Sequence, residues 1–143
     1  MVSWSPMRAA TCLLLCSILP ATMAMARQDT AATRAASNGA YSEAQAVRGK
    51  DVYHDQCSSC HLPKDHANAD FRQNWNGRTV KALYDYIRST MPDDAPGELT
   101  EQQYLDATAY ILKLNTMPAG DVALTADTTF QKRFILNLKA PTP

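Results

Sequence analysis

Residues 42–61 read SEAQAVRGKDVYHDQCSSCH, and this stretch carries the strongest indications of both fold and function. Ser42 and Gln45 have the spacing of a capping box, in which a hydroxyl and a side-chain amide satisfy backbone groups, so a helix should begin after Ser42 and run to about the cysteines. Gly49 lies inside this helix, where it costs about 1 kcal/mol relative to alanine. We therefore expect another helix to approach closely there, with Tyr53 one turn further along the same face. An exposed glycine without a packing role is the alternative.

Cys57, Cys60 and His61 form a C-x-x-C-H motif, which is associated with covalent attachment of c-type haem. On one helical turn the three positions lie on one face, so two thiols can meet two vinyl groups while the imidazole reaches the iron. A zinc site that adds His66 would need the neighbours Cys60 and His61 at two corners of one tetrahedron. A thioredoxin-like dithiol would need a βαβ context, and a plain disulfide would leave His61 without a role. The motif therefore predicts one covalent haem c with its iron.

A haem iron held by His61 has a second axial position, and methionine there produces a low-spin electron carrier with a raised potential. Met91 is the predicted ligand, because it opens an irregular stretch that can fold over the haem face opposite His61. Met117 lies after the last predicted helix and would have to reach back across it. For both, a thioether that merely fills a gap is the alternative. Two histidines are further candidate ligands that we expect to be exposed instead: His54 and His66.

Two more helices follow from apolar spacing and capping signals. Apolar side chains recur at i, i+3, i+4 and i+7 in one segment, namely at Val80, Leu83, Tyr84 and Ile87. This pattern predicts a helix from Thr79 to Met91, which the following proline ends. Thr100 and Gln103 form a second capping box, which opens a helix through Leu114.

The predicted core of roughly residues 42–115 is all-α, because no segment alternates with period two. Such a core is close to the size of roughly 70–80 residues below which a hydrophobic core rarely stabilises a domain without an additional cross-link or cofactor. A large apolar group, covalently attached between three short helices, would provide that stabilisation.

The first 26 residues have the pattern of a secretory signal peptide. A short basic start ends at Arg8, an apolar run covers residues 11–19, and Ala24-Met25-Ala26 is a small-x-small cleavage signal. The apolar run is shorter than the ~20 residues that span a bilayer, so we expect an exported, periplasmic protein without stable membrane insertion. Arg8 is the only charged residue before position 27, so the rest of the chain carries 13 basic and 14 acidic side chains. This balance disfavours nucleic acid as a partner.

Five motifs together resemble a class I cytochrome c, especially the small monohaem domains associated with periplasmic quinoprotein alcohol dehydrogenases. They are Gly49-x-x-x-Tyr53, Cys57-Ser58-Ser59-Cys60-His61, Trp75-Asn76-Gly77-Arg78-Thr79, Met91-Pro92 and Tyr110-Ile111-Leu112. The resemblance covers roughly residues 43–121 and implies a small fold of three main helices around one covalent haem. It also implies the site: thioethers at Cys57 and Cys60, iron ligands His61 and Met91, and a helix crossing of Gly49 and Tyr53 near Tyr110.

The chain departs from this family directly after His61. Family members usually carry glycine there and a Gly/Pro-containing loop in which a proline carbonyl orients the imidazole, whereas residues 62–70 here contain no glycine. The Pro63 carbonyl is the candidate acceptor for His61. Trp75 and Arg78 are candidate donors to a haem propionate, through the indole N–H and the guanidinium fork. A core tryptophan and a solvated arginine are the alternative.

The expected organisation is a signal peptide (residues 1–26), a mobile leader (27–41), a monohaem domain (42–121) and a C-terminal tail (122–143). The expected function is one-electron transfer rather than catalysis, since a filled sixth position leaves oxygen or peroxide no open site. By the resemblance, a periplasmic dehydrogenase, possibly a quinoprotein, is the donor, and another cytochrome or an oxidase is the acceptor. Two alternatives stay open: a ligand-binding or sensor protein whose Met91 is displaced, and a subunit of a larger redox complex whose apolar tail packs on a neighbour.

Overall fold

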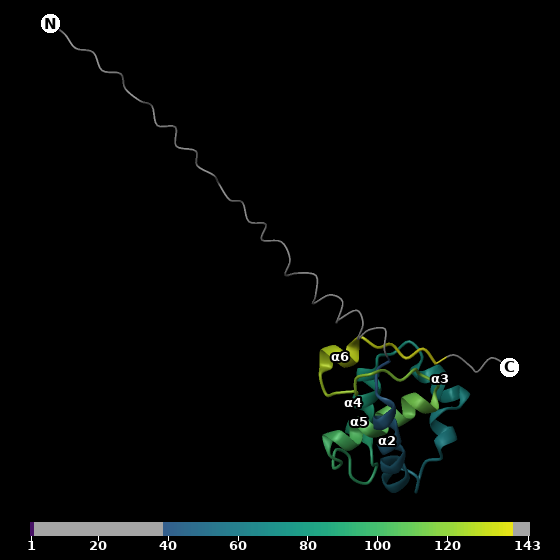
Figure 1. Cartoon of the computed structure of the whole chain (residues 1–143). Coiled ribbons are helices and arrows are strands. Elements are labelled where there is room, and N and C mark those ends of the chain that lie inside the picture. Colours follow the sequence, from purple (N-terminus) through teal and green to yellow (C-terminus); the bar gives the residue numbers. More distant parts are fainter. Residues whose placement is uncertain (2–38, 139–143) are drawn as a thin grey trace.

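The computed structural model describes residues 39–138 together with Met1, so the predicted signal peptide and most of the predicted leader lie outside the described residues. The described part is built from helices in the order α2 (Glu43–Gln56), η1 (Pro63–His66), α3 (Ala69–Trp75), α4 (Val80–Thr90), α5 (Glu101–Leu114) and α6 (Thr128–Lys132) (Figure 1). Within residues 39–138 only two isolated β-bridges occur and no strand. The predicted all-α fold is confirmed.

The three long helices begin and end where the capping signals place them. Thr100 and Gln103 close the predicted capping box at the start of α5. At the start of α2 only half of the predicted box forms, because the Ser42 hydroxyl accepts from the backbone N–H of Gln45. The Gln45 side chain bonds to the backbone of Leu124 instead, donating to its carbonyl at 2.9 Å and accepting from its N–H at 2.7 Å. The capping-box prediction was therefore wrong for Gln45.

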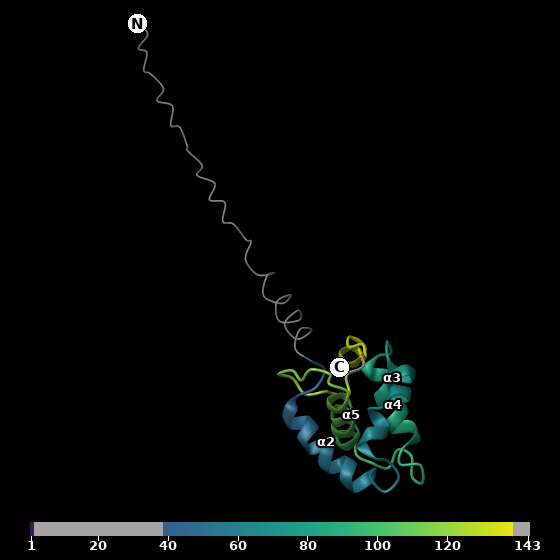
Figure 2. The same cartoon turned by 90° about the vertical axis from the view of Figure 1, so that its right-hand side faces the viewer.

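The crossing of α2 and α5 is the tightest contact between helices in the domain. A Cβ atom added at Gly49 would lie 1.8 Å from the backbone oxygen of Asp106 on α5, so no other residue fits without a shift. One turn further on, the rings of Tyr53 and Tyr110 meet at 5.3 Å between centroids. The predicted close approach at Gly49 is confirmed. On the other side of α5 lies α4, so that α5 separates α2 from α4 (Figure 2).

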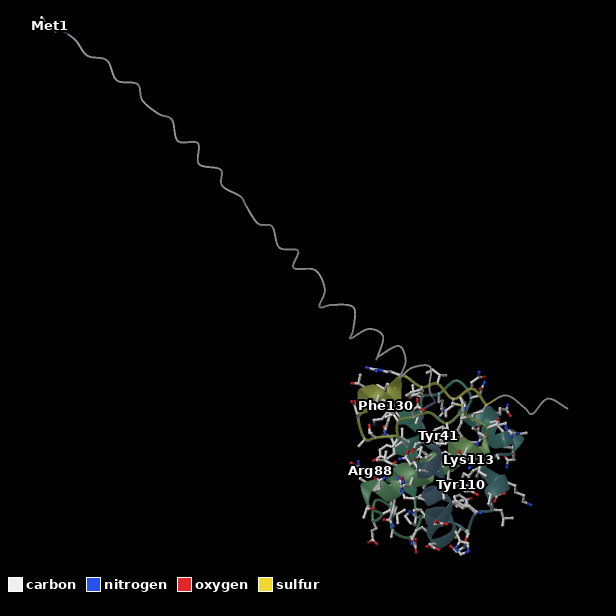
Figure 3. The ribbon with its side chains drawn as sticks, in the orientation of Figure 1. Met1, Tyr41, Arg88, Tyr110, Lys113 and Phe130 are labelled. Carbon is white, nitrogen blue, oxygen red and sulfur yellow. The ribbon has the colours of Figure 1, made fainter. Side chains whose placement is uncertain are left out.

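The ordered core extends beyond the predicted limit near residue 115. Tyr41 is buried before α2, and its hydroxyl donates to the Met117 carbonyl at 2.7 Å (Figure 3). The chain after α5 returns across the start of α4, where Val80 N–H donates to the Phe134 carbonyl at 2.9 Å. Its buried side chains are Leu124, Gln131, Leu136 and Leu138. The described part of the expected tail thus packs on its own domain.

Candidate functional site

The C-x-x-C-H motif continues the last turn of α2. Cys57 is the C-terminal cap of that helix, and its carbonyl accepts from the N–H groups of Cys60 at 3.1 Å and His61 at 2.9 Å. The three side chains therefore leave one turn of backbone, as the spacing predicts. Both cysteines are free thiols, Cys57 half-buried and Cys60 exposed. Burial raises the pKa of the Cys57 thiol above its usual value.

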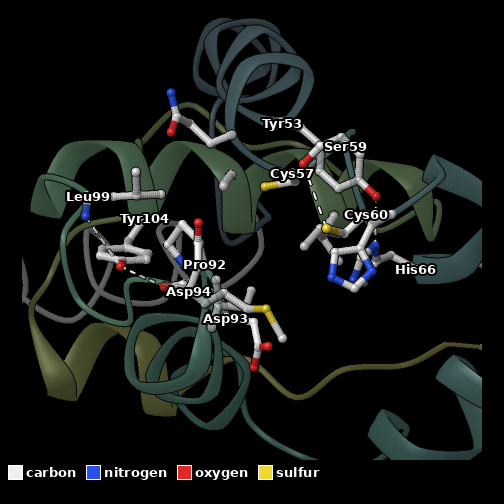
Figure 4. Close-up of a pocket in the computed structure, with 16 residues that line it drawn as sticks. Tyr53, Cys57, Ser59, Cys60, His66, Pro92, Asp93, Asp94, Leu99 and Tyr104 are labelled. Carbon is white, nitrogen blue, oxygen red and sulfur yellow. Dashed lines mark hydrogen bonds between the residues drawn. The ribbon is translucent and has the colours of Figure 1, made fainter.

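The motif faces a cavity of about 270 Å³ between the end of α2, the stretch after α4, and α5 (Figure 4). Cys57 and Cys60 line it from one side, and Pro92, Asp93 and Asp94 line it from another (Figure 4). His61 and Met91 line the same cavity. Its remaining wall is largely apolar and includes Ile87, Leu99, Ala107 and Ile111. The cavity thus combines two thiols, an imidazole and a thioether with walls that exclude water.

A second cavity, of about 310 Å³, adjoins the first. The two share five lining residues: His61, His66, Ile87, Met91 and Ile111. The second cavity continues between α3 and α4, where Phe71, Trp75 and Tyr86 line it. Because they share these lining residues, the two cavities adjoin, and we call them together the slot. Pockets that hold a large organic ligand span about 300–1,000 Å³, a range that the two cavities together reach.

The two candidate methionines differ in where they lie. Met91 caps the end of α4 and lines both cavities, and its carbonyl accepts from the hydroxyl of Tyr104 on α5 at 2.7 Å. Met117 packs against the core and lines neither cavity. The structure therefore brings Met91, and not Met117, to the slot that contains His61. Tyr104, a fully buried residue of α5, positions the backbone of Met91.

The two remaining histidines also differ. His54 is on α2 with 82% of its side chain exposed, as expected. The expectation of exposure was wrong for His66, because η1 turns it inward against the domain. Its Nδ1 lies 2.9 Å from the Tyr53 hydroxyl, and its ring centroid is 4.9 Å from that of His61. Burial, and next the neighbouring His61, lowers the pKa of His66, while burial raises that of Tyr53.

The candidate propionate donors lie at the second cavity and beside it. Trp75 is almost fully buried and lines that cavity, packed against Phe71 and Tyr86. Arg78 is exposed and lines neither cavity, and its guanidinium carbon lies 5.0 Å from the centre of the Trp75 ring. Such a stacked arginine can still donate hydrogen bonds from its guanidinium. The two side chains are therefore brought together.

The competing metal-site interpretation finds no support in the part of the chain that the structure describes. No group of three or more histidine, cysteine, aspartate or glutamate side chains there is arranged to hold a metal ion. The donor set of the slot fits a haem instead, because its two thiols stand three residues apart on one turn and its walls are apolar.

Comparison with known families agrees with this geometry. Residues 44–111 match the family described as cytochrome c oxidase, cbb3-type, subunit III. Neither a curated protein nor a solved structure matches the chain. The match supports a c-type cytochrome domain in this segment, and such a domain transfers electrons and is not an enzyme in itself. It binds covalent haem c with its iron.

Proposed function

We propose that this chain is a periplasmic one-electron carrier whose haem is joined to Cys57 and Cys60 and whose iron lies between His61 and Met91. The observation that carries the proposal is that two thiols, an imidazole and a thioether line one largely apolar cavity. When bound, the haem supplies a ferric/ferrous couple. Cys57 and Cys60 would hold it covalently, and His61 and Met91 would bind its iron.

Met91 decides between an electron carrier and a ligand-binding protein. A thioether on the iron blocks the position at which oxygen, peroxide or carbon monoxide would bind. The hydrogen bond from Tyr104 to the Met91 carbonyl fixes the backbone of this residue from the neighbouring helix. A ligand held in that way favours the carrier over the alternative in which Met91 is readily displaced.

Optical spectra of the oxidised and reduced protein test this assignment directly. The wild-type protein should show the weak far-red band of sulfur bound to ferric iron, and its haem should stay with the protein in acid acetone. Met91→Ala should lose the band, lower the potential and bind carbon monoxide when reduced. Met117→Leu is the matched control and should change none of these. Loss of the band in Met117→Leu would show that the other methionine is the ligand.

Trp75 and Arg78 are proposed to bind a haem propionate. Trp75 lines the second cavity and Arg78 lies against its ring, so two kinds of donor lie next to each other beside that cavity. Arg78→Leu should lower the midpoint potential, because a positive charge near a propionate offsets its negative charge. Arg88→Leu, an exposed arginine on α4 outside both cavities, is the control. Equal potentials for both variants would contradict the proposal.

The proposal also includes export to the periplasm and redox partners there. Intact-mass measurement of periplasmic protein should show Arg27 as the first residue, and retention of residues 1–26 would contradict export. In the described residues no helix is both long and apolar enough to cross a membrane. We propose a periplasmic dehydrogenase, possibly a quinoprotein, as donor, and another cytochrome or a terminal oxidase as acceptor.

Docking should depend on a small apolar rim rather than on charge. The formal charges nearly cancel, and Leu62, directly after His61, is 53% exposed. A near-neutral carrier receives little long-range steering. Stopped-flow reduction by such a dehydrogenase should be fast, with a shallow dependence on salt. A steep salt dependence would indicate charge-steered docking, and no reduction would point to a different donor.

A subunit of a larger redox complex is the second candidate. The matched family favours it, because its description names a subunit of an oxidase. The apolar tail that was expected to pack on a neighbour does not supply this contact as far as residue 138, since Leu136 and Leu138 are buried in the domain itself. Light scattering of the periplasmic protein separates the candidates, because a carrier should have the mass of one chain.

A further inference from the structure

The imidazole of His61 lacks the hydrogen bond that usually orients an iron-binding histidine. Metal-binding histidines generally donate their second ring N–H to a carboxylate, a carbonyl or water, which fixes the ring orientation. Among the residues that the structure describes, none forms a hydrogen bond with the His61 ring, and the expected bond to the Pro63 carbonyl is not formed. The side chains that contact this ring are therefore the described groups that can orient it.

His66 occupies the place beside it. The two rings lie with centroids 4.9 Å apart and planes inclined by 66°, an edge-to-face contact in which rotation of one ring is limited by the other. Both rings line both cavities, so the contact lies at the wall of the proposed haem slot. A side chain that rotates freely could not orient the His61 ring. His66 can do so only if its own ring is held in place.

His66 is held from three directions. The Tyr53 hydroxyl on α2 lies 2.9 Å from its Nδ1, and the Phe71 ring on α3 packs edge-on at 5.6 Å. Asn115, at the end of α5, donates its side-chain N–H to the His66 carbonyl at 2.6 Å. Three separate helices thus fix the backbone and the ring of one residue.

We propose that His66 is a positioning residue that sets the plane of the His61 imidazole, with Tyr53 holding the His66 ring in place. The inference rests on the proposed ligation of iron by His61 and deepens it. Packing between two rings replaces the proline carbonyl of the related cytochromes, which explains how residues 62–70 serve a haem without their glycine. His66 also covers one side of His61 from water.

Proton NMR of the ferric haem protein provides the test, because the hyperfine shifts of the four haem methyl groups depend on the plane of the axial imidazole. His66→Ala should change the spacing or order of these shifts and lower the midpoint potential, since water gains access to the ligand. His66→Phe, which keeps a ring, should restore the wild-type pattern. Tyr53→Phe should shift the methyl resonances in the same direction as His66→Ala, by less. His54→Ala, at an exposed histidine, is the matched control.

The methyl shifts of these variants decide whether His66 orients the His61 ring. Wild-type methyl shifts in His66→Ala overturn the inference, and so does a His66→Phe protein that resembles His66→Ala. Where His66→Ala fails to fold, Tyr53→Phe decides, because wild-type shifts in that variant overturn the inference as well. Failure of the proposed function is distinguishable, since it appears in the wild-type protein as a missing far-red band or as haem released by acid acetone.

Discussion

The two sides of α5 are closed in different ways. Toward α2, Gly49 brings the helix backbones so near that one added carbon atom would collide with the Asp106 carbonyl. Toward α4, the side chains of Ala107 and Ile111 line the first cavity. One helix therefore takes part in a close backbone crossing on one side and in the wall of the slot on the other.

This difference explains how so small a domain can be both stable and redox-active. A covalently attached haem would add dispersion contacts for the side chains that line the slot. Those contacts would reach the stretch after α4 and residues 61–66, whereas α2 and α5 pack directly on each other. The chain thus stabilises one half by its own packing and leaves the other half to be stabilised by the cofactor.

The largest expected effect is removal of the cofactor. Cys57→Ser combined with Cys60→Ser should give apo-protein that is largely unfolded, because the slot loses the group around which its walls pack. Hydrogen exchange should show residual protection in the Gly49 region of α2 and less in α4. Ser58→Ala combined with Ser59→Ala, in the same turn, should attach haem and fold. Cooperative unfolding of the double cysteine variant at wild-type stability would remove the distinction between the two sides.

The second-largest effect is expected when a side chain is added at Gly49, where α2 crosses α5. Gly49→Ala should lower the free energy of unfolding by about 3 kcal/mol, because the obstacle is backbone and cannot rotate away. Its optical spectrum should stay that of the wild type, since Gly49 lines neither cavity. Lys50→Ala, at the exposed neighbouring position, should change stability by about 0.5 kcal/mol or less. Equal denaturation midpoints for the two variants would show that the crossing tolerates a side chain.

Local signals predicted the closed side of the molecule well. The helix bounds follow from Ser42, Thr79 and Thr100, each of which caps a helix, and Gly49 indicated the close crossing before any coordinates were known. These features depend on residues within a few positions of one another. Helix α3 spans seven residues and α6 five, too few for an apolar period to emerge, and neither was predicted.

The sequence motifs pointed to several residues that line the slot, but not to the residues that support them. The motif at Cys57 and the order of the two methionines placed the residues that the structure brings together at the slot. His66 was expected to be exposed, because no local pattern shows that Tyr53 and Asn115 converge on it. Gln45 was assigned to its own helix for the same reason, since its partner stands 79 positions away. Long-range partners of polar side chains leave no periodic trace in a sequence.

Substitution of Gln45 should lower the free energy of unfolding by less than substitution of Gly49. Gln45→Ala leaves both the N–H and the carbonyl of Leu124 without their buried partner, which should lower the free energy of unfolding by about 2 kcal/mol. The loss should be the same for the reduced and the oxidised protein, because Gln45 lines neither cavity. Gln73→Ala, at an exposed position of α3, is the control. A stability change confined to one oxidation state would connect this contact to the slot.

The smallest effect is expected at the surface of the same crossing, where two ion pairs join α2 to α5. Lys113 pairs with Glu43, and their side chains are 44% and 59% exposed, so water and salt screen the pair. Arg48 pairs with Asp106, whose side chain is only 5% exposed and accepts two bonds from the guanidinium, at 2.9 and 3.0 Å. Lys113→Ala should therefore lower the free energy of unfolding by about 0.5 kcal/mol, and by less at high salt.

Arg48→Ala should lower the free energy of unfolding further, because it leaves a buried carboxylate with one remaining side-chain partner, Gln102. Urea denaturation at low and high salt measures both, and an equal, salt-sensitive loss in the two variants would show that burial does not separate them.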